Sequence, residues 1–252
     1  MSGTDHLIRT NHPDGVTEIC LNRAPVNALS PAFLFDLADT LKELETDEAV
    51  RSVVISSPFK VLSAGLDLKA AQNFTFEQQH SIVEALNVGF LALFAFPKPT
   101  VVAINGAAIA GGLFFVLSSD LRVAGPKASL GLAEVRVGAD FPVGPLEIAR
   151  ATLSPDMLRR LMLTGQPIRA NAAFAAGIVD VLEEETETVL PRALQEARTL
   201  AALPAIAYAS IKRQIRGSAI ATIEHAIQNG ANAPAGGWFN AETKDAMQRM
   251  IG

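Results

Sequence analysis

The sequence predicts an α/β protein with a largely parallel β-sheet, and two observations support this prediction. In the first part of the chain, short runs rich in β-branched and apolar residues, typical of buried strands, alternate with helical patterns. Strands separated by helices are joined by crossover connections, which place the strands parallel in one sheet. From about Pro155 onward, helical patterns dominate instead. The strand-like runs are residues 16–22, 51–57, 100–105 and 120–125.

Local signals predict the helices. Ser30 and Pro31 suit the N-cap and first turn of a helix, and apolar residues then recur every three or four positions over residues 32–48. One more strand-like run, 177–184, lies among the later helices. Several of those helices are apolar around much of their circumference, so they are expected to pack on the core or on another subunit of a homo-oligomer. They cover residues 157–165, 171–177, 191–203, 205–217 and 242–251.

One apolar stretch imitates a membrane span. Residues 101–119 carry no charge and approach the length of about 20 apolar residues that a spanning helix needs. The pairs Asn105-Gly106 and Gly111-Gly112 interrupt the run at positions that favour turns. A buried strand, a turn and a helix start are therefore predicted, with no membrane partner.

Composition excludes several classes of function. With 49% hydrophobic and 19% charged residues, the chain is expected to fold around a core. A net charge of −5 without a basic cluster argues against a nucleic-acid partner. Cys20 is the single cysteine and the four histidines show no ligand spacing, so neither a disulfide nor a metal site is expected. The first residues lack a signal-peptide pattern, which favours a cytoplasmic location.

Two glycine-containing loops could expose main-chain amides. In SAGLDLKA, Gly65 permits a tight turn and Asp67 can cap the following helix, which leaves the amide of Leu66 free. In AGGLFF, the pair Gly111-Gly112 stands at a predicted helix start, where free amides and the helix dipole favour negative charge. Two such amides could share an oxyanion, and each donor contributes about 3–4 kcal/mol to an enolate-like transition state.

The order of these loops and their neighbours identifies a resemblance. The blocks LNRAPVNALS, SAGLDLKA, KPTVVAINGAAIAGG, LSSDLRVAGPKASLGLAEVRVG and LTGQPIRANAAFAAGIVDVL together resemble the crotonase (enoyl-CoA hydratase/isomerase) superfamily from about Arg9 to the end. The resemblance implies a spiral core of ββα units over residues 1–190 and a helical trimerisation region over 191–252. It also implies acyl-CoA thioester substrates, a homotrimer or a dimer of trimers, and no cofactor, since CoA is part of the substrate.

The resemblance also implies roles for individual residues. The oxyanion hole would consist of the amides of Leu66 and Gly111. The CoA-contacting residues would be Arg23, Val26, Ala28, Ala64, Leu66 and Lys69, with Lys69 near the phosphates. Trp238 is expected to pack among the carboxy-terminal helices, a region that in this family can approach a neighbouring subunit's pocket.

The acids distinguish between reactions. Family hydratases use two glutamates, and this chain has Phe114 in the first position and Glu134 in the second. A single carboxylate with an aromatic partner resembles Δ3,Δ2-enoyl-CoA isomerases, and desolvation by Phe114 should raise the pKa of Glu134. Asp140 is a second candidate acid, although its position before Pro142 favours a turn-forming role over a catalytic one. Without the family blocks, Glu134 beside Arg136 would be read as a surface charge.

The interpretation we adopt is an acyl-CoA double-bond isomerase that uses Glu134. The alternatives are a hydratase or another crotonase-type lyase or hydrolase that uses Glu134 with Asp140 or a positioned water, and a non-catalytic acyl-CoA-binding protein.

Overall fold

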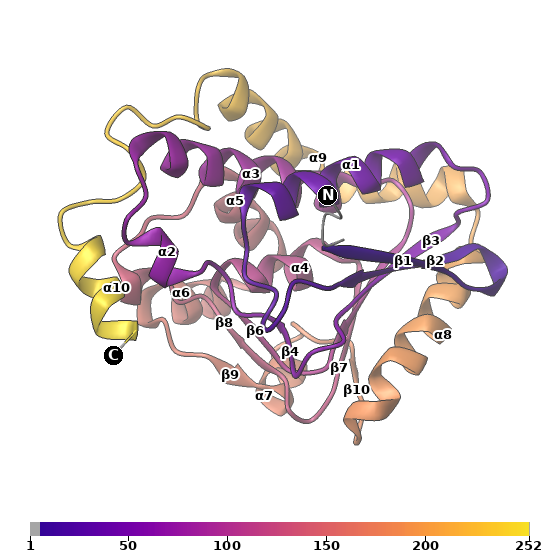
Figure 1. Ribbon diagram of the computed structural model, residues 1–252. Helices are drawn as coiled ribbons and strands as arrows, with labels where there is room; N and C mark the ends of the chain where they lie inside the picture. The colour runs from indigo at the N-terminus through magenta and orange to yellow at the C-terminus, as the bar shows by residue number, and fades with distance from the viewer. Residues whose placement is uncertain (1–5, 252) are drawn as a thin grey trace, which may run out of the picture.

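The computed structural model describes residues 6–251 and has two sheets joined by a spiral path of the chain (Figure 1). Within these residues the large sheet has six strands, of which β1 and β2 pair antiparallel and the others pair parallel. In spatial order they are β1 (Leu7–Asn11), β2 (Val16–Leu21), β3 (Ser52–Ser56), β5 (Thr100–Ile104), β7 (Leu121–Ala124) and β10 (Val181–Leu182). The predicted strands and their parallel arrangement are confirmed.

The smaller sheet carries the second strand of each spiral turn. After β3, β5 and β7 in the large sheet, the chain passes directly to β4, β6 and β8 in the small sheet and then into helical structure. This repeated strand–strand–helix path is the predicted spiral of ββα units. In spatial order the small sheet, within the described chain, is β4 (Val61–Ser63), β6 (Ala107–Ile109), β8 (Ser129–Gly131) and β9 (Ile168–Arg169).

Helices complete the turns and the carboxy-terminal region. The α-helices are α1 (Pro31–Thr46), α2 (Leu68–Ala71), α3 (Phe76–Ala95), α4 (Phe114–Ser118), α5 (Val143–Thr152), α6 (Pro155–Thr164), α7 (Ala170–Ala175), α8 (Val189–Ala201), α9 (Ala205–Gln228) and α10 (Thr243–Ile251). Short 3₁₀ helices are η1 (Pro13–Gly15), η2 (Ala110–Leu113), η3 (Glu134–Val137) and η4 (Thr186–Thr188). Ser30 caps α1 as predicted, since its side chain accepts a hydrogen bond from the amide of Phe33.

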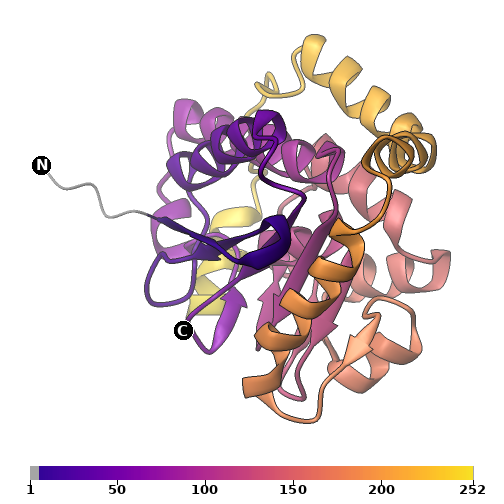
Figure 2. The same ribbon diagram turned by 90° about the vertical axis from the view of Figure 1, so that its right-hand side faces the viewer.

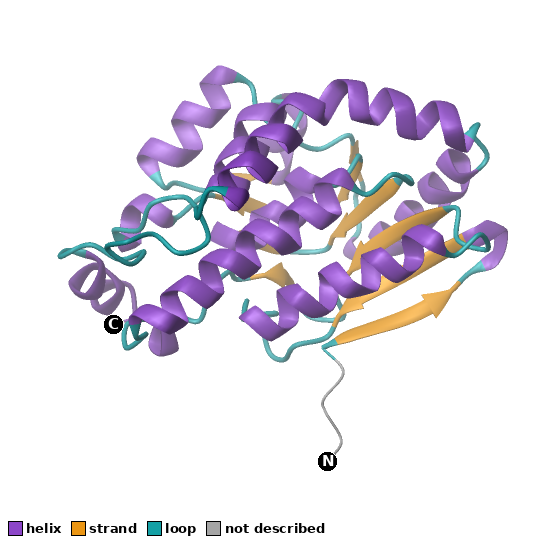
Figure 3. Ribbon diagram, turned by 90° about the horizontal axis from the view of Figure 1, so that it is seen from above, coloured by secondary structure: helices purple, strands orange, loops and turns teal. Residues whose placement is uncertain are grey.

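Helices cover both faces of the large sheet (Figures 2 and 3). On one face, Val189, Ala193 and Ala197 of α8 pack against valines of β2, β3, β5 and β7. On the other face, a larger cluster joins the sheet to α1, α3, α4 and α5. The boundary at residue 190 between the spiral core and the carboxy-terminal helical region stays a prediction. It falls within α8, and α8 packs on the large sheet.

A buried ionic cluster fixes α9 to the end of the large sheet. The carboxylate of Asp120, just before β7, pairs with Lys212 at 2.7 Å and with Arg216 at 2.8 Å. The same carboxylate accepts a hydrogen bond from the Tyr208 hydroxyl at 2.9 Å. The two cations are buried, and they also donate to main-chain carbonyls, Lys212 to Lys98 and Arg216 to Phe94 and Ser118. In the part of the chain that the structure describes, no helix has the length and apolar character to span a membrane.

Candidate active site

The two predicted loops lie side by side. Gly65, which follows β4, has φ of +79°, and a Cβ there would lie 2.8 Å from the carbonyl oxygen of Ile109 and 3.3 Å from the amide nitrogen of Gly111. Ala110, between the latter two residues, also has a positive φ of 51°. Glycine is favoured at position 65 because its backbone angle is left-handed and the space for a side chain is taken. The close contact brings Leu66 and Gly111 to one place.

The amides of Leu66 and Gly111 are available to a ligand. Among residues 6–251, the hydrogen bonds of these two loops include neither amide. Asp67 caps α2 as predicted, accepting from the amides of Lys69 at 3.0 Å and Ala70 at 3.3 Å, and this fixes the turn that carries Leu66. Leu66 and Gly111 both line one cavity, and two main-chain donors in one site are what an oxyanion hole requires.

Both loops open into an apolar cavity of about 140 Å³. Apolar side chains form nearly all of its wall. The lining residues are Leu29, Ala64, Leu66, Leu68, Leu86, Ile109, Ala110, Gly111, Phe114, Ala133, Glu134, Val137, Ala139, Phe141, Pro142, Pro145, Trp238, Met247 and Met250.

Glu134 is the one ionisable side chain among these lining residues of the described chain. It begins η3 and is only 7% exposed. Its Oε2 atom has no hydrogen-bond partner among the described residues. Burial raises the pKa of Glu134 to about 8, although hydrogen bonds from the amides of Glu134 and Ala133 favour the charged form. The sequence pattern alone would have placed this residue at the surface, whereas the structure places it in the cavity.

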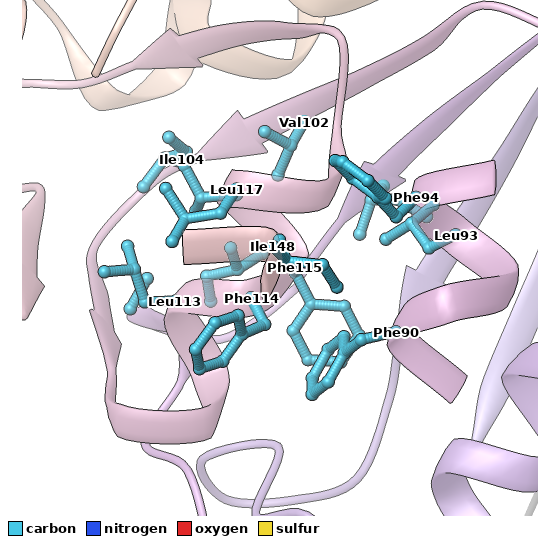
Figure 4. Packing of buried hydrophobic residues seen from close by; sticks show 14 of the residues in the cluster. Phe90, Leu93, Phe94, Val102, Ile104, Leu113, Phe114, Phe115, Leu117 and Ile148 are labelled. Carbon is cyan, nitrogen blue, oxygen red and sulfur yellow. The ribbon is translucent and has the colours of Figure 1, made fainter. Parts of the chain in front are cut away.

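Phe114 forms an apolar wall of the same cavity. Figure 4 shows its ring near those of Phe90 and Phe115. It is 1% exposed, and its ring packs against Phe90 with centroids 5.5 Å apart and against Phe141 at 6.5 Å. Phe115, its neighbour, packs edge-on against the same Phe90. These packed aromatic rings give this part of the wall an apolar surface.

A surface groove adjoins the cavity. The predicted CoA-contacting residues all line it, and the groove shares Ala64 and Leu66 with the cavity. The guanidinium of Arg23 donates to the carbonyl oxygen of Ala28, which closes the turn between them. Lys69 is exposed at the edge of this groove. The residues concerned are Arg23, Val26, Ala28, Ala64, Leu66 and Lys69; their contact with CoA stays a prediction.

Asp140 is the predicted acid that the structure does not bring to the cavity. Its neighbours Ala139 and Phe141 line the cavity, whereas Asp140 is exposed and is absent from the lining. Successive side chains alternate in direction along this extended segment, which explains the separation. Within the described residues, the carboxylate available to a bound ligand is therefore that of Glu134, and a catalytic role for Asp140 has no geometric support.

Trp238 is the cavity residue whose role the sequence did not predict. It stands on the segment between α9 and α10 and lines the cavity of its own chain. No sequence signal distinguished it from an ordinary packed aromatic residue. No cluster of three or more metal-ligating side chains occurs within residues 6–251.

The fold and the site define a class of protein: a crotonase-type spiral with two main-chain donors beside an apolar cavity. Comparison with known proteins agrees with this definition. A family model described as enoyl-CoA hydratase/isomerase matches residues 11–233, and the chain belongs to this enoyl-CoA hydratase/isomerase family. The protein is therefore an enzyme of the crotonase superfamily, and an acyl-CoA thioester is consistent with the family as its substrate.

Individual relatives differ in their named activities. A putative enoyl-CoA hydratase of Thermus thermophilus is 35% identical over 178 residues, covering 69% of this chain and 68% of the relative. A 4-chlorobenzoyl coenzyme A dehalogenase of Arthrobacter sp is 30% identical, covering 90% of this chain and 86% of the relative. The crystal structure of human mitochondrial delta3-delta2-enoyl-CoA isomerase superposes with a TM-score of 0.88 at 25% identity, covering 98% of this chain and 97% of that one.

Proposed function

We propose that the enzyme moves the double bond of a 3-enoyl-CoA to the 2 position, with Glu134 as the only proton carrier. The observation that supports this most directly is the isolation of Glu134. It is the one ionisable residue on the cavity wall within the described chain, and one of its oxygens has no partner. A reaction that needs a single acid–base group suits this site better than one that needs two.

The proposed reaction is a proton transfer within the substrate. The thioester oxygen accepts hydrogen bonds from the amides of Leu66 and Gly111, which makes the protons on C2 more acidic. The carboxylate of Glu134 removes one C2 proton, and the electron pair of that C–H bond delocalises over C2, C3 and C4 and onto the thioester oxygen. Glu134 then returns the same proton to C4. The double bond is left between C2 and C3, with no atom gained or lost.

The apolar wall supports isomerisation over hydration. Phe114 occupies the position at which the family resemblance implies the first glutamate of hydratases. A phenyl ring cannot activate water, and its burial among Phe90 and Phe141 leaves no polar group to bind one there. The raised pKa of Glu134 also makes it a stronger base once it is ionised.

Two substrates test the proposal. Purified protein is expected to convert 3-enoyl-CoA to 2-enoyl-CoA and to leave crotonyl-CoA unhydrated. Glu134→Gln should abolish the conversion, whereas Glu84→Gln, on the exposed side of α3, should leave it unchanged. Phe114→Glu should introduce hydration of crotonyl-CoA. Turnover of crotonyl-CoA alone by the wild-type protein would refute the isomerase proposal.

Hydration is the second candidate. It is supported by relatives such as the putative hydratase of Thermus thermophilus, and it would require a water held without a second acid.

A homotrimer or dimer of trimers is likewise proposed. Ile211 and Ile215 lie one turn apart on α9 and are exposed at 55% and 75%, as expected of a face that another copy covers.

A further inference from the structure

The segment between α9 and α10 closes one side of the cavity. We call residues 234–240 the strap. Its Trp238 lines the cavity together with Met247 and Met250 of α10, and none of the three lines the neighbouring groove. The groove and the cavity meet instead at Ala64 and Leu66. A thioester whose CoA part lies in the groove would enter the cavity past Ala64 and Leu66, and its acyl part would share the cavity with Trp238 and α10.

One buried side chain holds the strap. Gln79 of α3 is 8% exposed, and its Oε1 atom accepts hydrogen bonds from the amides of Trp238 at 2.8 Å and Phe239 at 3.1 Å. Its Nε2 atom donates to the carbonyl oxygen of Phe74 at 3.2 Å. Gly237 lets the strap approach α3, since a Cβ there would lie 2.6 Å from the ring of Phe76. A single acceptor thus fixes two successive main-chain amides.

The indole itself is fixed from the opposite side. Its Nε1 atom donates to the carbonyl oxygen of Asp140 at 2.9 Å, and Phe239 forms a bridge with Ala139. Both partners follow η3, the turn that carries Glu134. Because the only polar atom of the indole already has a partner, Trp238 offers an apolar surface to the cavity.

We propose that Trp238, positioned by Gln79, determines which acyl groups the enzyme accepts, and that these are hydrocarbon chains without polar substituents. This rests on the proposed function in one respect, that the cavity receives the acyl part of a thioester. Apart from Glu134, the lining side chains within the described residues offer no free polar group. A hydroxyl or carboxylate on the acyl chain would lose its water there without gaining a partner, which is unfavourable.

Trp238 is the single tryptophan of the chain, so its fluorescence reports directly on this contact. Saturated acyl-CoAs of increasing length, each with bromine on the terminal carbon, are titrated into the wild-type protein. We expect free CoA to leave the emission unchanged and the brominated chains to quench it once they are long enough to reach the indole. Brominated chains that bind, as shown by calorimetry, but quench at no length would overturn the proposal.

Saturated chains have no double bond to move, so this experiment does not depend on isomerase activity. Quenching without turnover of 3-enoyl-CoA would refute the proposed function and leave the role of Trp238 intact. Turnover of 3-enoyl-CoA without quenching would overturn the proposed role of Trp238 and leave the proposed function intact.

Variants separate the roles of the two residues. Trp238→Ala is expected to change the affinity ratio of long to short saturated acyl-CoAs by roughly tenfold or more, the effect of methylene-sized changes in apolar pockets. Trp238→Phe should change this affinity ratio less. It keeps an aromatic side chain at this position and so provides a test if Trp238→Ala does not fold. Gln79→Leu should shift the ratio in the same direction without altering affinity for free CoA. Gln195→Leu, which changes an exposed glutamine of α8, should leave the ratio unchanged. An unchanged affinity ratio in Trp238→Ala would overturn the proposed role of Trp238. An unchanged ratio in Gln79→Leu would overturn the proposal that Gln79 positions Trp238.

Discussion

Replacing Glu134 by glutamine should stabilise the protein while it removes the activity. Burial raises the pKa of Glu134 from 4.5 to about 8, so the folded state favours the protonated form over most of the neutral range. Between these two pH values the unfolded chain releases this proton and the folded protein does not. The stabilising contribution of the protonated group is thus complete below pH 4.5 and is lost as the pH rises to 8.

The magnitude follows from the pKa difference. Each pH unit between 4.5 and 8 removes about 1.4 kcal/mol from the free energy of unfolding of the wild type. At pH 7 the loss is about 3 kcal/mol. Glutamine has nearly the same shape and no charge, so Glu134→Gln should recover this amount. For a chain of this size, that corresponds to an increase in Tm of about 6–12 °C at pH 7.

Equilibrium urea unfolding at pH 4.5, 6, 7 and 8.5, followed by circular dichroism at one protein concentration, measures the effect. The difference between Glu134→Gln and wild type should be small at pH 4.5, should grow with pH and should level off above 8. Glu84→Gln, which changes an exposed glutamate of α3, serves as the matched control and should show no such trend. A difference that does not change with pH, or a destabilised Glu134→Gln at pH 8.5, would refute the reasoning.

Three further predictions concern the same site and its support. The kcat/KM of the wild type for 3-enoyl-CoA should rise with pH and reach half its maximum near pH 8, because only the ionised Glu134 is a base; a flat profile between pH 6 and 9 would contradict this. Gly65→Ala should lower kcat by about 100-fold or more, since its Cβ would meet the carbonyl oxygen of Ile109 and displace an oxyanion donor; steady-state kinetics on a variant with unchanged circular dichroism would show it. Asp120→Ala should lower the free energy of unfolding by about 3–5 kcal/mol because two cations of α9 lose their buried partner, whereas Glu43→Ala, which breaks an exposed pair, should cost less than about 1 kcal/mol in the same urea assay.

The sequence predicted those parts of the site that depend on local rules. A glycine that needs a left-handed backbone, an aspartate cap and a helix start are properties of a few neighbouring residues, and the loops at Gly65 and Gly111 formed as expected. The alternation of strands and helices likewise predicted the parallel sheet. These signals are local, so a sequence reveals them without knowledge of the tertiary structure.

The environment of individual side chains could not be predicted in the same way. The segment Glu134-Val135-Arg136 has the pattern of a surface turn. Arg136 is indeed exposed, but Glu134 is buried in a cavity that Phe141 and the carboxy-terminal segment also line. Trp238 reaches the cavity because Gln79, 159 residues away in the chain, accepts its amide. Such contacts depend on how distant segments meet, and no local pattern records them.

The apolar enclosure gives the site two properties through one physical cause. Exclusion of water raises the pKa of Glu134, because the carboxylate loses its hydration, and the same exclusion removes the molecule that a hydratase would add to the double bond. In the proposed isomerase, stronger basicity and the absence of hydration would therefore share one cause. The donors proposed for the oxyanion, the main-chain amides of Leu66 and Gly111, carry no charge, whereas a cationic side chain beside the thioester would lower the pKa of Glu134. A cavity wall of leucine, phenylalanine and tryptophan around one acid is thus a coherent arrangement for a proton transfer that must exclude solvent.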